Sequence, residues 1–443
     1  MNYQSAALLT GIESEPVPQV SLEAKTSNVK PVVRLALYLF VFSLPFDLPE
    51  LGLPLEVTTL TASIFLLSTL LQPRVCFRRP PFAIWCFVVY LYVYVSLIIW
   101  NNAQYRTLDL QLDQTKLLFL LLQAIALCWT TANVLREDQT ARTAVLSLAA
   151  AGTLLALIHL LGVARTTTEI ASNIERLSTF GQNPNTLGRH LSLGLLALIG
   201  IAYSRRKDPF RPAFVVWPVV LLVLMAITST GSRGSLIALG AGLLVFALGK
   251  DGAAARFRNV LVVAAAIGLA IWVSYRSETM EQRFERTLNE GSLAHREDIY
   301  PIAWKMVIDR PLLGWGPTIN MWELGSRIGE PDHRFRDTHN LLLEILTVTG
   351  ILGAIPFFAG ILLCLRAAWK GRDGPAGVLP LALLISILVS NVGANLLYNK
   401  ITWILLAYAL TSSSQFIGAR SPRAAISSRP PGQTFHQEQS LVI

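Results

Sequence analysis

The sequence predicts an all-α polytopic membrane protein, and three observations lead to this fold class. The 443 residues are 53% hydrophobic and only 15% charged, and their mean hydropathy is +0.49. Apolar stretches of about 20 residues, the length that crosses a bilayer as a helix, recur from residue 33 to residue 417. A soluble enzyme of this length would carry more charge, so we expect the chain to reside in a membrane.

About twelve of these stretches are candidate transmembrane helices, because each comes close to the length that a span needs. They are residues 33–48, 54–71, 82–100, 115–134, 142–164, 186–204, 213–229, 234–249, 259–275, 345–369, 376–395 and 399–417. The expected regions are a disordered cytoplasmic arm (1–31), transmembrane helices one to nine (32–275), a large periplasmic loop (276–338), transmembrane helices ten to twelve (339–417) and a cytoplasmic tail (418–443).

Basic residues in the short connections indicate the orientation of the chain. If every stretch spans, they all fall on one side: Arg74, Arg78, Arg79, Arg205, Arg206, Lys207, Arg211, Lys250, Arg256, Arg258, Lys370 and Arg372. Short loops rich in lysine and arginine stay in the cytoplasm, so we expect this side and both termini to be cytoplasmic. The same asymmetry accounts for the net charge of +9, so nucleic acid is not an expected partner.

Three polar segments stand on the opposite side, each where a predicted helix begins. They are Ser-Thr-Phe-Gly-Gln-Asn-Pro-Asn-Thr-Leu-Gly-Arg (178–189), Thr-Gly-Ser-Arg-Gly (230–234) and Asp-Thr-His-Asn (337–340). They place Arg189, Arg233 and His339 near helix N-termini, which favour anions, and the planar fork of arginine grips phosphate oxygens. Such groups inside a membrane protein are by default functional, so together they predict a diphosphate site. For Arg189 alone, a contact with lipid headgroups explains the position equally well.

His339 differs from the other histidines in its position. It follows Asp337 and Thr338, either of which can cap the helix that begins there. The positive end of a helix disfavours imidazolium, so we expect a neutral ring that can accept a proton. His159 and His190 fall within apolar stretches, where packed histidines are the simpler interpretation.

The one long connection, residues 276–338, is expected to hold a helix of its own. Apolar residues recur there at helical spacing: Ile299, Ile302, Ala303, Met306 and Val307. The segment Arg-Pro-Leu-Leu-Gly-Trp-Gly-Pro (310–317) then breaks the chain. A loop of this length with its own helix is typical of a lid or binding element, although a small domain that only seals the bundle fits the same pattern.

Other chemistries find no matching motif in the sequence. It contains no Asp-x-Asp nucleotide–metal motif, no Gly-x₄-Gly-Lys phosphate loop, no His-Glu-x-x-His and no Gly-x-Ser-x-Gly. The four cysteines form no Cys-x-x-Cys pair, so neither a thiolate metal site nor a disulfide framework is expected. A lipid-linked donor fits better, because its leaving group is already activated and arginine can hold it.

In this order, the polar segments resemble the O-antigen ligase and O-antigen polymerase family of bacterial envelopes. The matching pieces are Phe-Gly-Gln-Asn-Pro-Asn-Thr-Leu-Gly-Arg (180–189), Thr-Gly-Ser-Arg-Gly-Ser (230–235), Arg-Glu-Asp-Ile-Tyr-Pro-Ile-Ala-Trp-Lys-Met (296–306) with residues 310–317, and Thr-His-Asn-Leu-Leu-Leu-Glu-Ile-Leu (338–346) with Gly-Ile-Leu-Gly (350–353). The resemblance implies a GT-C-like, multi-pass glycosyltransferase of the bacterial inner membrane whose active site faces the periplasm.

Such enzymes move a glycan from undecaprenyl diphosphate to a periplasmic acceptor, with inversion and without a metal or other cofactor. The implied partners are the undecaprenyl-diphosphate-linked glycan, the lipid A core or a growing polysaccharide as acceptor, and membrane lipid. At the matching positions, the resemblance implies that His339 is the catalytic base. It implies that the diphosphate is bound by Arg189, Arg233 and Arg296, with Asn340 and Asn185 in support.

Two questions stay open at this point. Ligation and polymerisation use the same kind of donor site, so the sequence does not separate them. The competing class is a membrane transporter of a small anion or of bicarbonate, which would use the same arginines. A transporter has little need for a large loop on one side only, so residues 276–338 favour the enzyme.

Overall fold

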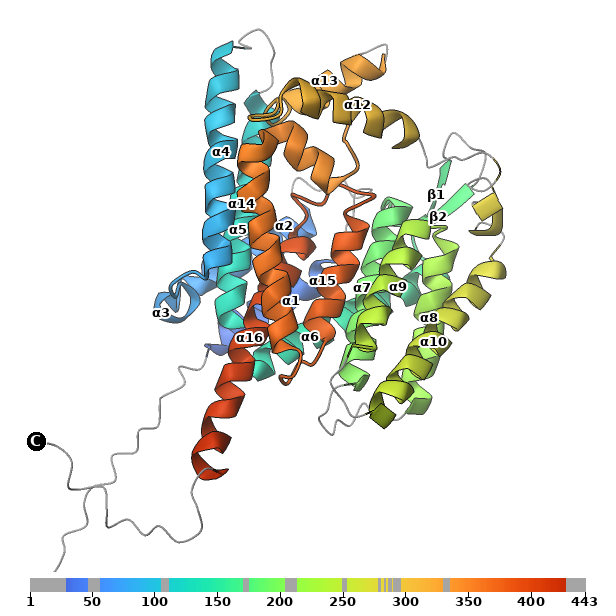
Figure 1. The fold of residues 1–443 in the computed structure, drawn as a ribbon. Helices are drawn as coiled ribbons and strands as arrows, with labels where there is room; N and C mark the ends of the chain where they lie inside the picture. The colour runs from blue at the N-terminus through green and yellow to red at the C-terminus, as the bar shows by residue number, and fades with distance from the viewer. Residues whose placement is uncertain are drawn as a thin grey trace, which may run out of the picture.

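The computed structural model describes residues 29–46, 56–104, 111–169, 175–203, 213–248, 253–277, 280–282, 284–285, 289, 296–329 and 335–427. They form a bundle of helices with one two-stranded hairpin and two further helices at the same end (Figure 1). Most of the predicted cytoplasmic arm and tail lies outside these residues, as does the connection 47–55.

The described elements follow the predicted apolar stretches. They are α1 (Pro31–Ser43), α2 (Val57–Thr69), α3 (Pro73–Cys76), α4 (Phe82–Gln104), α5 (Gln111–Val134), α6 (Asp138–Leu160), β1 (Arg165–Glu169), β2 (Glu175–Thr179), α7 (Pro184–Tyr203), α8 (Ala213–Ser229), α9 (Arg233–Phe246), α10 (Ala253–Tyr275), α12 (Arg296–Asp309), α13 (Ile319–Ile328), α14 (Leu341–Gly371), α15 (Leu379–Ser390) and α16 (Lys400–Ser427). Each of the twelve stretches contains a helix, and α16 runs past the predicted end of the last span.

Four helices are long and apolar enough to cross a membrane: Phe82–Ala103, Asp113–Val134, Asp138–Leu160 and Leu341–Gly371. Six more apolar helices among the described residues are shorter. The chain is therefore a mostly helical, multi-pass membrane protein, as expected. The number of twelve spans stays a prediction.

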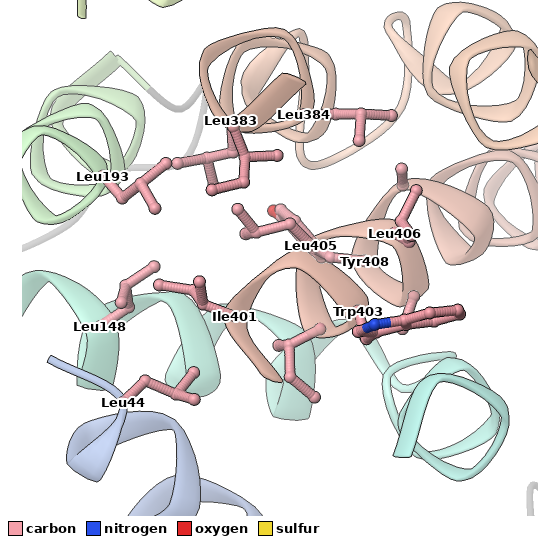
Figure 2. Packing of buried hydrophobic residues seen from close by; sticks show 14 of the residues in the cluster. Leu44, Leu148, Leu193, Leu383, Leu384, Ile401, Trp403, Leu405, Leu406 and Tyr408 are labelled. Atoms are coloured by element: carbon pink, nitrogen blue, oxygen red, sulfur yellow. The ribbon is translucent and has the colours of Figure 1, made fainter. Parts of the chain in front are cut away.

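The core lies where four of these helices meet. Figure 2 shows Leu148 of α6, Leu193 of α7 and Leu383 of α15 around Ile401 of α16, and all four side chains are buried. Small residues bring α6 and α7 into backbone contact, since a Cβ added at Gly194 would lie 2.9 Å from the Cα of Gly152. Close approach at small residues is how membrane helices gain van der Waals packing without a hydrophobic driving force.

The amphipathic helix predicted in the long loop is confirmed as α12. Ile299, Ala303, Met306 and Val307 are buried, and most of them form a small separate core with α13 and the start of α14. The break predicted after it is also present. After the break, the chain turns back and contacts α14 at residues 347–352.

A kink in α14 receives this turn. Gly350 has φ 60° and ψ −161°, so the helix is interrupted there and main-chain groups on both sides lose their helical partners. The segment Pro311–Gly316 supplies four replacements. Trp315 N donates to Thr347 O (2.7 Å), Gly316 N to Val348 O (2.8 Å), Ile351 N to Pro311 O (2.8 Å) and Leu352 N to Leu312 O (3.2 Å). Buried main-chain groups must be paired, so the break at Gly350 anchors the turn between α12 and α13 against α14. We call α12 and α13 the outer helices.

The hairpin between α6 and α7 is a difference from the sequence-based expectation. Its strands pair antiparallel, from Arg165 opposite Thr179 to Glu169 opposite Glu175. No strand is predicted here, because Arg-Thr-Thr-Thr-Glu (165–169) and Glu-Arg-Leu-Ser-Thr (175–179) lack the apolar alternation that marks a half-buried strand.

Replacing Gly350 by alanine is expected to loosen this anchor. An added Cβ would collide with Leu312 O, and the backbone conformation at Gly350 is one that almost only glycine adopts. The backbone strain alone should lower the free energy of unfolding by about 1–3 kcal/mol. Thermal unfolding of the purified protein, followed by tryptophan fluorescence, measures this loss.

Gly268→Ala in α10 is the matched control, because nothing lies within 4 Å of an added Cβ there. It should leave the unfolding temperature unchanged or raise it slightly. Equal unfolding temperatures for the two variants would contradict the proposed anchor.

Candidate functional site

The starts of α7 and α9 are joined by an arginine that the sequence did not single out. Arg176 on β2 is 2% exposed; its Nε donates to Thr230 O (3.1 Å) and its Nη2 to Asn185 Oδ1 (2.9 Å). Asn185 Oδ1 also accepts from the Ser232 hydroxyl (3.2 Å). The hairpin therefore holds two of the three predicted polar segments in one fixed arrangement at the end of the bundle (Figure 1).

The same two helix starts pack closely. A Cβ added at Gly188 would lie 2.7 Å from Ser235 Oγ, so a larger side chain has no room between α7 and α9. The hydroxyls of Ser232 and Ser235 lie 2.8 Å apart. The glycine and serine residues of these segments thus allow α7 and α9 to pack closely. This packing sets the positions of the neighbouring arginines.

The two predicted arginines of these helices differ in their surroundings. Arg233 is the first residue of α9, as expected, and is partly exposed. Arg189 lies one helical turn after Asn185 and is only 6% exposed. Among the described residues, none forms a hydrogen bond or an ion pair with the Arg189 guanidinium. Burying an unpaired charge costs free energy, and an anion at this position would offset that cost.

Arg296 begins α12 and faces the connection between α15 and α16. Its Nη2 donates to Gly393 O at 2.7 Å. Arg233 lies close enough to Arg296 and Glu297 for their charges to interact. The first residue of α12 thus lies within electrostatic range of the first residue of α9.

Tyr300, one turn after Arg296 on α12, connects this arginine to the third segment. Its hydroxyl lies 2.9 Å from Val392 O and 3.3 Å from His339 O. Burial raises the pKa of Tyr300, and the nearby Arg296 acts in the opposite direction. The phenol is therefore a neutral donor near pH 7. In the sequence, only its place in the matching motif distinguishes Tyr300.

His339 stands at an exposed, strained position just before α14. Its φ is 50°, a left-handed conformation that is uncommon for residues with a side chain. Asp337 stabilises it, because Asp337 Oδ1 accepts from His339 N at 2.9 Å while Asp337 Oδ2 lies 3.9 Å from His339 Nδ1. The imidazole side chain is 47% exposed and so accessible to a ligand.

The predicted cap of this helix was wrong. Asn340, not Asp337 or Thr338, is the N-cap, and its Oδ1 accepts from Leu342 N (2.9 Å) and Leu343 N (3.1 Å). The Asn340 amide also donates to Val392 O at 3.1 Å. Asparagine, aspartate and threonine all cap helices well, so residue type alone does not show which of them is the N-cap. The backbone conformation does.

A buried glutamate lies next to the segment that carries His339, and the sequence analysis did not predict it. Glu344 is 2% exposed, accepts from Thr338 Oγ1 at 2.9 Å and from Asn320 Nδ2 at 3.2 Å, and so joins α13 to the segment that carries His339. An acidic residue within the run Leu-Leu-Leu-Glu-Ile-Leu (341–346) is itself a signal, because such residues in membrane proteins are rare and usually functional.

Arg296 and Asn340 thus meet at residues 392–393, with His339 next to Asn340, and Arg233 lies within electrostatic range of Arg296. Arg189 is buried deeper in α7. The long loop holds other arginines in the sequence. Arg276 lies over the Trp272 ring, 5.3 Å from its centroid, and Arg283 and Arg286 lie outside the described residues. The two histidines expected to be packed are buried, and His159 contacts Thr179 and Ser229.

Comparison with known proteins gives two matches. A model of the family described as O-antigen ligase matches residues 218–358. An O-antigen ligase of Pseudomonas aeruginosa is 27% identical over 265 residues, which cover 56% of this chain and 60% of that protein. The chain is thus similar to O-antigen ligases over these residues. The alignment spans less than two thirds of the relative's length, and neither match favours a transporter.

The family match runs from α8 into α14 and contains Arg233, Arg296, His339 and Asn340. Arg189 and Asn185 precede it. The matched region therefore includes four of the six predicted site residues, and the hairpin connects it to Asn185.

Replacing Arg176 by glutamine is expected to destabilise the protein. Asn185 Oδ1 and Thr230 O would each lose a buried donor, at a cost of about 1–3 kcal/mol for an unsatisfied group. Arg165→Gln, on the exposed side of the same hairpin, should have almost no effect. Chemical unfolding of both variants compares them, and equal stability would show that the Arg176 contacts do not hold the hairpin.

Replacing Asn340 tests the corrected cap. Asn340→Ala should cost about 1 kcal/mol of stability, because two main-chain donors of α14 lose their acceptor. Asn340→Ser keeps a capping oxygen and should recover most of that loss, although it cannot donate to Val392. If serine proves as destabilising as alanine in thermal unfolding, the cap is not the role of Asn340.

Proposed function

We propose that the protein transfers a glycan from undecaprenyl diphosphate to an acceptor on the periplasmic side of the bacterial inner membrane, as in O-antigen ligation. The observation that carries the proposal is the meeting of Arg233, Arg296 and His339 at one end of the bundle, within the O-antigen ligase match. The reaction is proposed to be metal-independent and inverting, with the polyprenyl tail remaining in the membrane.

The arginines are proposed to bind the diphosphate. Transfer leaves negative charge on the departing diphosphate, and cations fixed beforehand stabilise that charge without having to move. The charges of Arg233 and Arg296 repel each other, and Glu297 offsets this repulsion at Arg233; an anion bound beside both arginines would offset it further. Arg189, buried without a described acidic partner, is proposed to contact the same anion from below.

His339 is proposed to be the general base. It would take the proton of the acceptor hydroxyl as that oxygen bonds to the anomeric carbon and the carbon–oxygen bond to the diphosphate breaks. Asp337, which holds the His339 main chain and faces its Nδ1, is proposed to orient the ring, as carboxylates do for catalytic histidines. Asn340 and Asn185 are proposed to position the segments that carry His339 and Arg189.

The acceptor is proposed to be the lipid A core or a growing polysaccharide chain. Both present a sugar hydroxyl beside the membrane, so a base in an exposed position suits either. The exposure of His339 supports this choice, because a large acceptor must reach the ring from outside.

His339→Ala is the direct test. The transfer rate should fall by about 10²–10⁴-fold, the usual contribution of a general base, while the protein still inserts and unfolds at the same temperature. The measurement is transfer from a purified undecaprenyl-diphosphate glycan to lipopolysaccharide core, using protein in nanodiscs.

Arg372→Ala provides the control for this assay. Arg372 lies at the opposite end of α14, over the Trp369 ring, and its loss should leave transfer unchanged. Wild-type transfer by the His339→Ala protein would remove the proposed base, and a comparable loss in Arg372→Ala would show that the assay reports damage to the bundle.

A further inference from the structure

An exposed apolar stripe runs along α12 and into the turn that follows it. The stripe consists of Trp304, Ile308, Leu312 and Leu313, which are 51%, 62%, 61% and 49% exposed. Trp304 and Ile308 share one face of α12 because they are four residues apart. The opposite face, with Ala303 and Met306, is already buried against α13 and α14. Contiguous apolar side chains left exposed in this way usually mark an interaction surface.

The stripe is continuous with the lipid-exposed side of the bundle. Leu352 N donates to Leu312 O, so the end of the stripe touches α14 at Ile351 and Leu352, which are themselves exposed. Ile355, one turn further along α14, is 65% exposed. Apolar side chains on a helix long enough to span a membrane face lipid, so the α12 stripe adjoins a surface that lipid covers.

Two helices place this junction at the depth of the membrane boundary. From Gly350 to Gly371, α14 measures about 32 Å at about 1.5 Å per residue, close to the thickness of a bilayer core. On α4, Asn101 Nδ2 donates to Trp315 O, so the turn lies level with the exposed Trp100. Tryptophan is enriched where lipid tails meet headgroups.

Charges beside the stripe fit the same boundary. Lys305 is exposed next to Trp304, and Arg310 stacks on Trp315 at 3.9 Å. The nearby Asp309 is neutralised by Arg327 at 2.6 Å. A helix with an apolar face and basic flanks typically lies in the plane of a membrane and contacts lipid phosphates.

We propose that α12 is an interfacial helix whose stripe lies in the headgroup–acyl boundary of the leaflet on the side of the site. Arg296 and Tyr300 stand at the other end of the same helix. Contact with lipid therefore sets the depth at which these two side chains stand above the membrane. This inference concerns the membrane itself and does not depend on which reaction the site performs.

A fluorescent probe tests the position of the stripe. The four native cysteines are buried, so bimane can be attached selectively to Ile308→Cys or Leu312→Cys in protein reconstituted into phosphatidylglycerol-containing vesicles. Ser326→Cys is the control, because α13 lies on the side of α12 away from the bundle (Figure 1). Size-exclusion profiles and thermal unfolding verify that each variant folds.

Nitroxide lipids labelled near the headgroup should quench bimane at residues 308 and 312 severalfold more strongly than at residue 326, and aqueous iodide should show the reverse order. Equal quenching by nitroxide lipid at all three positions would overturn the proposal. A blue-shifted emission at 308 and 312 without nitroxide quenching would also overturn it, because a second protein copy and not lipid would then cover the stripe.

Discussion

The site depends on a single interruption in α14. At Gly350 the main-chain hydrogen bonds within the helix are interrupted, and the segment Pro311–Gly316 forms four main-chain hydrogen bonds with α14 instead. This pairing separates the spanning part of α14 from Leu341–Thr349. It also fixes the turn after α12 against the bundle, so the helix that carries Arg296 is held at both ends. A continuous helix at this point would remove all four of these main-chain hydrogen bonds.

The second constraint is electrostatic. Arg233, Arg296 and the buried Arg189 and Arg176 gather at one end of the bundle, where cations repel each other and lose hydration. Hydrogen bonds to main-chain oxygens of Thr230 and Gly393 satisfy part of this charge without neutralising it. Of the acids nearby, Glu297 interacts with Arg233, Asp337 contacts His339, and Glu344 accepts from Thr338 and Asn320. Fixed cations of this kind are what the proposed diphosphate site requires.

The sequence predicted the parts of the structure that rest on local patterns. Apolar stretches predicted the helices, the spacing of Ile299, Ala303 and Met306 predicted α12, and proline and glycine predicted the break at residues 310–317. Arg233 stands at the first position of α9 because a Thr-Gly-Ser turn can only end one helix and begin another.

The parts that the sequence left out depend on contacts between distant segments. Arg176 looks like a solvated side chain of a polar loop, and its role appears only when the hairpin folds against α7 and α9. The capping role of Asn340 depends on its extended backbone, which no pattern distinguishes from that of Asp337. Burial of Arg189 likewise follows from the packing of α7 within the bundle, where a helix-end arginine would otherwise reach lipid headgroups.

The central claim is that Arg233 and Arg296 act together on one diphosphate. Its most direct measurement is the binding of undecaprenyl diphosphate to nanodisc-embedded wild-type protein, Arg233→Ala, Arg296→Ala and the double variant. Each single change should weaken binding, and the double variant should depart from the sum of the two losses, because residues that share a partner are coupled. Unchanged binding in the single variants, or losses that simply add, would contradict a shared site.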